Sequence, residues 1–197
     1  MANIVIVTET GSDITAAEAA ELGVELVPMH VAIGDVTIDD GTLDPAEMLE
    51  QCRQLGVLPH TSGSTPADFS AVFDRIHEER PEAQILYIAY SAVTTCSYQS
   101  ACAAAEGRDY VSMLDTGHVT IGLALVVRKT VEHLRENPDI TVEGLLEWSL
   151  AFAKRVRMGF LPGDLGYLRA GGRLSNAAFV GATRAAHQAG RELLDGR

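Results

Sequence analysis

The residues best suited to hold a ligand carry hydroxyls, and they gather in four short segments of the chain. These segments are 8–13 (TETGSD), 61–65 (TSGST), 91–97 (SAVTTCS) and 115–118 (DTGH). Together they offer many hydroxyls and backbone N–H groups but few charges. Such groups hold a carboxylate or phosphate without a buried lysine. The same residue types also form helix caps and turns, so composition alone does not establish a site.

Nucleophilic catalysis is a second chemistry that these segments could support. Ser91 or Cys96 would be the nucleophile, with His60 or His118 as the base. The sequence contains no G-x-S-x-G elbow and neither of the glycine-rich phosphate loops, G-x-G-x-x-G and G-x-x-x-x-G-K-[ST]. His60 is equally well interpreted as a loop residue, and Cys96 as a small buried side chain. A serine or cysteine hydrolase therefore remains an alternative.

The cysteines and histidines do not have the spacing of known metal-binding motifs. Three cysteines form no C-x-x-C pair, and the six histidines show no H-E-x-x-H spacing. The adjacent acids Asp39 and Asp40 fit an exposed loop better than a metal pair. We expect no metal, no cofactor and no disulfide framework.

The net charge of the chain argues against several classes of binding partner. The formal net charge is -12, from 27 acidic and 15 basic residues. This argues against general nucleic-acid binding and against docking on an anionic membrane. No apolar stretch reaches the length of a membrane span, and the N-terminus lacks a basic leader and a cleavage pattern. We expect a cytoplasmic protein.

Strands and helices must alternate to position these segments. Short apolar runs predict buried strands, and capping patterns at Thr15, Asp44 and Thr65 predict helix starts. The expected strands are 3–8, 24–33, 84–90 and 109–114; the expected helices are 15–22, 44–55, 65–79, 98–106, 118–135 and 141–157. This order predicts an α/β fold with a mainly parallel sheet flanked by helices. Ligands bind beyond the carboxyl ends of such strands, where three of the four segments lie.

Six motifs also occur in a fixed order along the chain. They are 8–13 (TETGSD), 27–31 (VPMHV), 61–66 (TSGSTP), 91–101 (SAVTTCSYQSA), 115–116 (DT) and 165–175 (LGYLRAGGRLS). In this order they resemble the DegV family of bacterial fatty-acid-binding proteins. The most specific parts are Y-Q-S-A and Y-L-x-x-G-G-R. Glu9 departs from the family's aspartate by one methylene, and Cys96 replaces a glycine.

The resemblance implies two α/β domains with a long acyl chain between them. The first would span residues 1–157. Residues 158–197, with the Gly-Gly-Arg turn, would form an incomplete second α/β domain, because family members are longer. The resemblance implies that Thr61, Ser91, Thr95 and Cys96 hold the carboxylate. Further candidates for the pocket are Thr10, Ser62, Asp115 and Arg173.

The function implied by the resemblance is binding, not catalysis. The protein would hold a long-chain fatty acid and present it to a separate fatty-acid kinase. Two alternatives remain. One is an incomplete protein of this type without tight lipid binding, acting through self-association or a partner. The other is the hydrolase with Ser91 or Cys96 as its nucleophile.

Overall fold

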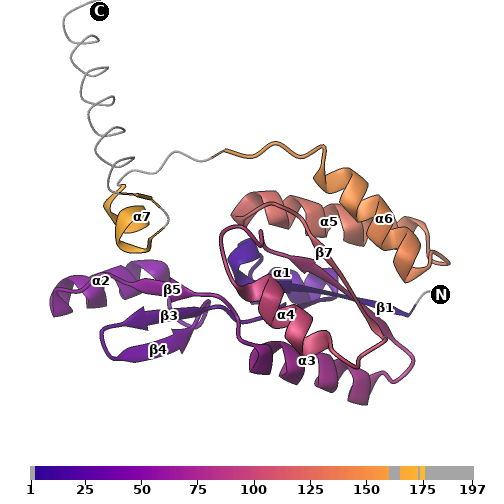
Figure 1. Ribbon diagram of the computed structural model, residues 1–197, viewed down its shortest axis with the longest axis horizontal. Helices are drawn as coiled ribbons and strands as arrows, with labels where there is room; N and C mark the ends of the chain where they lie inside the picture. Colours follow the sequence, from indigo (N-terminus) through magenta and orange to yellow (C-terminus); the bar gives the residue numbers. More distant parts are fainter. Residues whose placement is uncertain (1–2, 160–164, 173, 176–197) are drawn as a thin grey trace, which may run out of the picture.

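The computed structural model describes residues 3–159, 165–172 and 174–175, and its largest part is a parallel sheet between two layers of helices (Figure 1). The four strands run parallel in the order β2-β1-β6-β7. Their bounds are β1 (Ile4–Glu9), β2 (Val24–Val27), β6 (Gln84–Ala89) and β7 (Val111–Asp115). We call this sheet and its helices the main body.

Alternating side chains of the central strands pack against different helices, as the two-residue period of a strand requires. Ile6 and Leu86 face a core formed with α1 (Ala16–Leu22), α5 (Thr120–Glu136) and α6 (Val142–Ala153). Val7 and Tyr87 face the opposite core, formed with α3 (Pro66–Glu79) and α4 (Ser97–Ala105). Both faces of the sheet are therefore buried, as in other parallel sheets.

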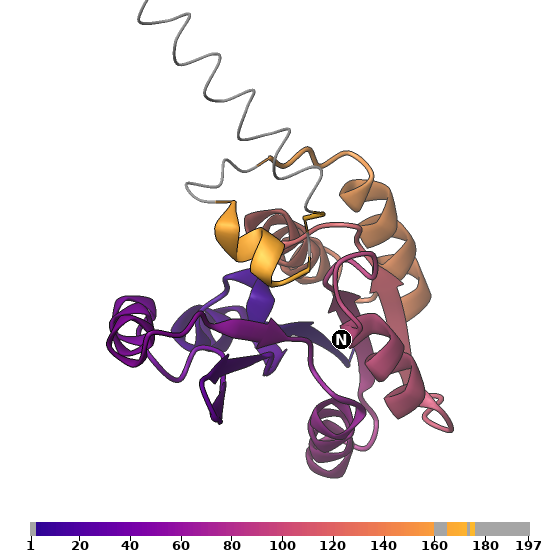
Figure 2. The same ribbon diagram turned by 60° about the vertical axis from the view of Figure 1, so that its left-hand side comes forward.

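A second, antiparallel sheet projects from one side of the main body (Figure 2). Its strands, in the order β4-β3-β5, are β3 (His30–Ile33), β4 (Val36–Asp39) and β5 (His60–Ser62). Helix α2 (Pro45–Leu55) packs on it through a small core that contains Val31, Ile33 and Cys52. We call residues 30–62 the small lobe.

The small lobe corrects two predictions. The expected single strand 24–33 is two strands in different sheets, β2 and β3. Pro28 has no N–H for a ladder, and the N–H of Met29 donates to Thr10 Oγ1 at 3.0 Å instead, so pairing stops there. Asp39 was expected in a loop, but it ends β4 and pairs with His30 in the register of the sheet.

The helices with clear capping signals begin and end where the sequence predicts. Thr65 and Asp68 form a complete capping box at the start of α3, and Asp44 caps α2. Thr15 caps α1, but the Glu18 carboxylate pairs with Arg128 of α5 instead of completing a capping box. Helix α6 ends at Ala153, four residues before the predicted end.

Beyond α6, the described residues include one short helix, α7 (Gly166–Ala170). The predicted domain boundary at residue 157 falls between α6 and α7. No described helix combines the length and apolar character needed to cross a lipid bilayer. Within the same residues, no three side chains of histidine, cysteine, aspartate or glutamate come together as a metal-binding group.

Candidate functional site

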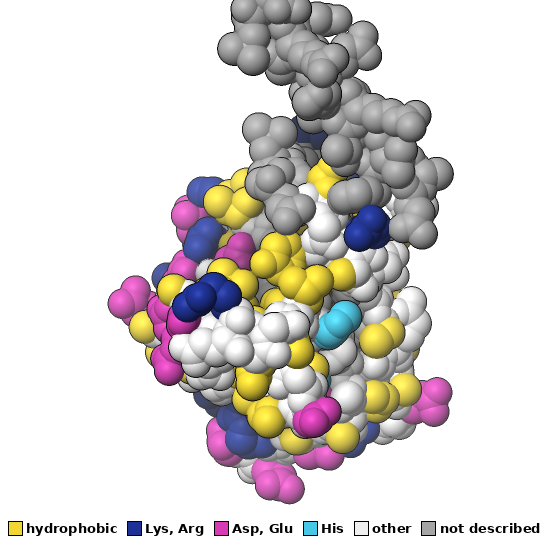
Figure 3. Space-filling model, turned by 90° about the vertical axis from the view of Figure 1, so that its left-hand side faces the viewer, with side chains coloured by type: hydrophobic (Ala, Val, Ile, Leu, Met, Phe, Trp, Pro, Cys, Tyr) yellow, Lys and Arg dark blue, Asp and Glu magenta, His cyan; other side chains and the backbone are white. Residues whose placement is uncertain are grey.

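A cavity of about 670 Å³ lies where the end of the small lobe, the loop before α4 and the residues after α7 meet. Its described lining is Ser62, Gly63, Val93, Thr94, Thr95, Cys96, Gly171 and Gly172. None of these residues is charged. Figure 3 views the molecule from the left-hand side of Figure 1, and hydrophobic and other uncharged side chains cover much of the middle of that face. The cavity can therefore offer hydroxyls and backbone N–H groups to a ligand.

Two loops that are far apart in the sequence are tied together beneath this cavity. The N–H of Ser64 donates to Ser97 Oγ at 3.1 Å, and Ser97 Oγ lies 3.2 Å from Thr95 Oγ1. A Cβ on Gly63 would lie 2.6 Å from Ser97 Oγ and closer still to Thr95 Oγ1. Position 63 therefore requires glycine for this close approach of the loops.

Helix α4 begins at the cavity. Its N-cap is Cys96, whose exposed thiol makes no capping hydrogen bond. The first N–H groups of a helix have no partner within it, and the helix dipole favours an anion there. Thr95, Cys96 and the start of α4 thus bring a hydroxyl and a helix N-terminus to the same side of the cavity.

Ser91 and Asp115, both predicted site residues, shape the loop and do not line the cavity. Ser91 is 4% exposed; its N–H donates to His118 O at 2.9 Å, and its carbonyl accepts from Thr94 N and Oγ1. Asp115 Oδ1 accepts from Ala92 N at 3.3 Å and from Gly117 N at 2.9 Å. Both residues hold the backbone of the 91–97 loop in its turn.

Thr61 and Ser62 occupy opposite faces of β5. Thr61 pairs with the buried Val31 and lines a separate small-lobe hollow of about 180 Å³, whereas Ser62 lines the larger cavity. Thr10 accepts the N–H of Met29 where the chain passes into the small lobe. Arg173 lies outside the described residues. The structure therefore brings Ser62, Thr95 and Cys96 together, without Thr61, Thr10, Ser91 or Asp115.

One residue that sequence reasoning did not assign to the site is Glu9, at the end of β1. Its side chain is fully buried, Oε2 accepts the N–H of Tyr90 at 2.8 Å, and the carboxyl lies beside the hydroxyls of Tyr87 and Ser97. Burial raises the pKa of Glu9, although the bond from Tyr90 and the neighbouring hydroxyls oppose the shift. The sequence marked Glu9 in one way, as a glutamate at a position where the DegV family has aspartate.

The hydrolase alternative gains no geometric support. Among the described residues, neither Ser91 nor Cys96 has a side-chain hydrogen bond to a histidine. His118 Nε2 lies 2.9 Å from Ala153 O, so this nitrogen is engaged by the backbone, and His60 is exposed on β5. A nucleophile and its base are expected within hydrogen-bond reach of each other.

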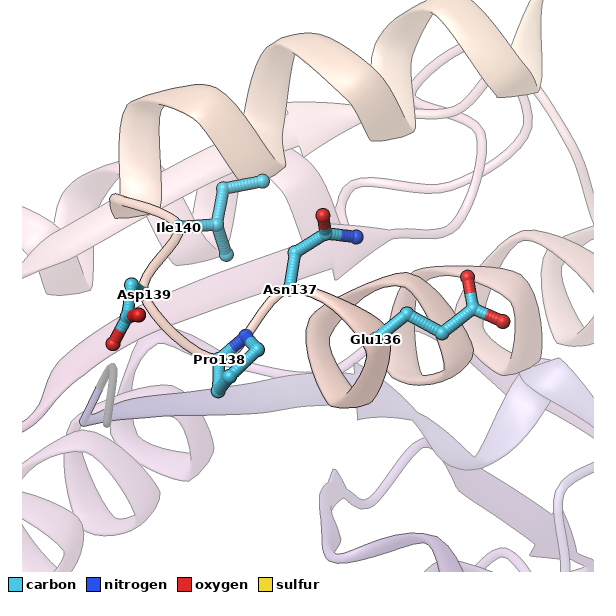
Figure 4. A pocket seen from close by; sticks show the side chains of 5 residues that line it. All are labelled: Glu136, Asn137, Pro138, Asp139 and Ile140. Carbon is cyan, nitrogen blue, oxygen red and sulfur yellow. The ribbon is translucent and has the colours of Figure 1, made fainter.

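Another hollow, of about 450 Å³, lies at the turn between α5 and α6 (Figure 4). Its lining among the described residues is the five consecutive residues 136–140, and their side chains do not converge on a common point. A single surface turn of this kind lacks the several convergent polar groups of a binding site. The cavity beside Thr95 is therefore the better candidate.

Comparison with known proteins shows which family the chain belongs to. A model of the DegV family, described as an uncharacterised protein family, matches residues 3–183. The chain belongs to the DegV family. A DegV domain-containing protein of Deinococcus radiodurans is 29% identical over 177 residues, which cover 89% of this chain and 62% of that protein.

Solved structures of DegV proteins agree with this fold. A DegV family protein of Thermus thermophilus, described by its fatty-acid binding, is 30% identical with a TM-score of 0.74, over 91% of this chain and 64% of that one. DegV of Bacillus subtilis, a fatty acid binding protein, has a TM-score of 0.80 at 24% identity over 92% of this chain and 64% of that one, which shows the fold alone.

A solved structure with lower sequence identity is named after a fatty acid kinase. The fatty acid kinase B3 protein of Streptococcus pneumoniae, loaded with linoleic acid, has a TM-score of 0.62 at 16% identity, over 78% of this chain and 55% of that one. This likeness again concerns the fold. The chain spans less than two thirds of the length of each protein named in these comparisons.

Proposed function

We propose that this DegV protein binds a long-chain fatty acid with its carboxylate in the cavity beside Thr95. The observation that carries the proposal is the uncharged, hydroxyl-bearing lining of that cavity at the N-terminus of α4. The Thermus thermophilus relative, which shares the fold at 30% identity, is described by its fatty-acid binding. The proposal transfers that ligand class to this chain.

The head group needs only a few neutral donors. Thr95 and Ser62 contribute hydroxyls, and the first turn of α4 contributes N–H groups. Hydrogen bonds to a charged acceptor contribute about 1.5–3 kcal/mol each, more than bonds between neutral groups. Burial of a lysine would add a desolvation cost that this arrangement avoids. A net charge of -12 is therefore compatible with an anionic ligand.

The acyl chain supplies most of the affinity, at about 0.8 kcal/mol for each buried CH₂. Side chains suited to cover it are exposed on the cavity loop and on α5. Val93, which lines the cavity, is 92% exposed, and Ile121 and Leu125 on the first turns of α5 are 63% and 39% exposed. His118, just before α5, bonds to Ser91 at the base of the cavity loop. The proposal runs the acyl chain from Thr95 toward this face of α5.

The role we propose is delivery, not catalysis. The protein would hold the acid while a separate fatty-acid kinase phosphorylates the carboxylate. In this arrangement the described residues beyond residue 157, with α7 among them, belong to a second domain that meets the first across the cavity. The cavity is lined by residues from both sides of the boundary at residue 157, which supports this arrangement.

The test uses delipidated protein and three ligands of equal chain length. Palmitate, hexadecanol and hexadecyl phosphate are titrated by calorimetry. We expect palmitate to bind at least about tenfold more tightly than the alcohol, since the alcohol offers no charge to the head-group donors. Equal binding of acid and alcohol would contradict a carboxylate site. Failure of every ligand to bind, with a dimer in solution, would favour the self-association alternative.

A further inference from the structure

Under the candidate cavity, three buried polar atoms have no hydrogen-bond partner among the described residues. They are Glu9 Oε1, Ser64 Oγ and Tyr87 OH. Ser64 and Glu9 both lie next to Ser97, and Glu9 lies next to Tyr87. Buried polar atoms are nearly always paired in native proteins, so a group of unpaired atoms calls for an explanation. Ser97 lies beside Glu9, Ser64 and Thr95, so its hydroxyl is common to these contacts.

The hydroxyl of Ser97 has one hydrogen to donate and two lone pairs to accept with. One lone pair accepts the N–H of Ser64 at 3.1 Å. The hydroxyl of Thr95 lies 3.2 Å away, and either oxygen of this pair can be the donor. Thr95 Oγ1 also accepts the N–H of Ser97 at 3.4 Å. The direction of the Thr95–Ser97 bond is therefore set by what Ser97 meets on its other side, which is Glu9.

The two protonation states of Glu9 give opposite directions. An ionised Glu9 only accepts, so the Ser97 hydrogen turns to it and the Thr95 hydrogen turns inward to Ser97. The cavity then faces a Thr95 oxygen without its hydrogen. A neutral Glu9 donates a hydrogen bond through its O–H to Ser97; Ser97 then donates to Thr95, and Thr95 is left with a hydrogen to donate into the cavity.

We propose that Glu9 is a positioning residue that, as a neutral acid bonded to Ser97, directs the Thr95 hydroxyl hydrogen into the cavity toward a ligand carboxylate. Glu9 touches no ligand; it acts through Ser97. This inference rests on the proposed function, because a carboxylate ligand is what needs a donor at Thr95. Burial, which raises the pKa of Glu9, favours the neutral form.

Other titratable groups in this cluster lie close enough to Tyr87 to affect its pKa. Tyr87 of β6 interacts with Glu9, with Tyr98 of α4 and with Asp115 at the end of β7. Tyr98 in turn interacts with Cys102 and Asp115. Burial holds the pKa of Tyr87 well above its usual value, so this hydroxyl stays protonated and available as a donor. Of the carboxyl groups in this cluster, Glu9 is the one beside Ser97, so its protonation state decides whether Ser97 faces a donor or only an acceptor.

The experiment compares the pH profile of palmitate binding in the wild type and in Glu9→Gln. An amide keeps a donor for Ser97 at every pH and an acceptor for Tyr90 N–H. As the pH rises through the raised pKa of Glu9, we expect wild-type affinity to fall by about tenfold, the effect of one donor to a carboxylate, and Glu9→Gln affinity to stay level. Ionisation of the ligand itself is common to both proteins and cancels in the comparison.

A second variant keeps the test decisive if Glu9→Gln folds poorly. Ser97→Ala interrupts the chain of hydroxyls, so it should also remove the pH dependence. Parallel profiles for the wild type and both variants would overturn the inference while leaving the proposed function intact. If the wild type binds no acid at any pH, the proposed function fails and the inference fails with it.

Discussion

His30 Nε2 lies 2.9 Å from Asp68 Oδ2, and this contact joins the small lobe to the main body. His30 is on β3, whereas Asp68 is in the first turn of α3, where it also completes the capping box with Thr65. The other ring nitrogen, Nδ1, lies 3.0 Å from Asp39 Oδ1 on β4. One imidazole thus lies between two carboxylates from different parts of the fold.

This contact predicts a pH-dependent stability. The hydrogen bond to Asp68 raises the pKa of His30, with smaller contributions from the charges of Asp68 and Asp39, although burial opposes the shift. The charged form is favoured in the folded state, so its stabilisation is complete below the ordinary pKa of about 6.5. It is lost as the pH rises through the raised value. Urea unfolding should show wild-type stability falling with pH relative to His30→Gln.

A matched control for that measurement is His60→Gln, since His60 is exposed on β5. Its substitution should leave the pH dependence of the wild type unchanged. A stability difference between the wild type and His30→Gln that stays constant from about pH 5 to pH 9 would contradict the role given to the imidazolium.

Removal of the Thr95 hydroxyl should weaken fatty-acid binding. Thr95 lines the cavity, whereas Thr61, the other threonine expected to hold the carboxylate, lines the small-lobe hollow. We expect Thr95→Ala to lower affinity for palmitate by about tenfold, because a charged acceptor loses one donor. Thr61→Ala should have the smaller effect. A larger loss of affinity with Thr61→Ala would contradict this position of the carboxylate and would place it in the small-lobe hollow instead.

The close approach at Gly63 gives a steric prediction. An added Cβ must displace Ser97 Oγ, 2.6 Å away, and Thr95 Oγ1. Gly63→Ala should therefore separate the two loops and reduce both palmitate affinity and thermal stability. Gly159→Ala is the control, because a Cβ there meets no described residue within 4 Å. Equal behaviour of the two variants would show that the loops tolerate separation.

The path proposed for the acyl chain can be tested with a charge. Ile121 on α5 and Leu55 on α2 are both 63% exposed, so glutamate at either position should cost little stability. Only Ile121→Glu places a carboxylate beside the acyl chain, and we expect it to weaken palmitate binding severely. Fluorescent-acid displacement measures both variants. Stronger impairment by Leu55→Glu would redirect the chain toward the small lobe.

The sequence predicted well the elements whose signals are local. Asp44 before Pro45, and Thr65 before Pro66, mark helix starts through contacts within one turn. β5 could not be found this way, because His60, Thr61 and Ser62 form an exposed three-residue strand that exists only through pairing with β3. Without β5, the alternation that separates Thr61 from Ser62 could not be predicted either.

The site was predicted in part for the same reason. The 91–97 loop was recognisable from its hydroxyls and its place between a strand and a helix. The burial of Glu9 and the contact of Gly63 with Ser97 depend on packing between segments far apart in the chain. No pattern within a single segment reports such contacts.

Lipid analysis of the protein purified under native conditions tests the central claim most directly. Organic extraction followed by mass spectrometry identifies any bound acid, and delipidated protein is then reloaded with the same acid. The account predicts a C14–C18 fatty acid, recovered at close to one per chain and restored on reloading. Recovery of no such acid, together with failure to load one, would contradict it.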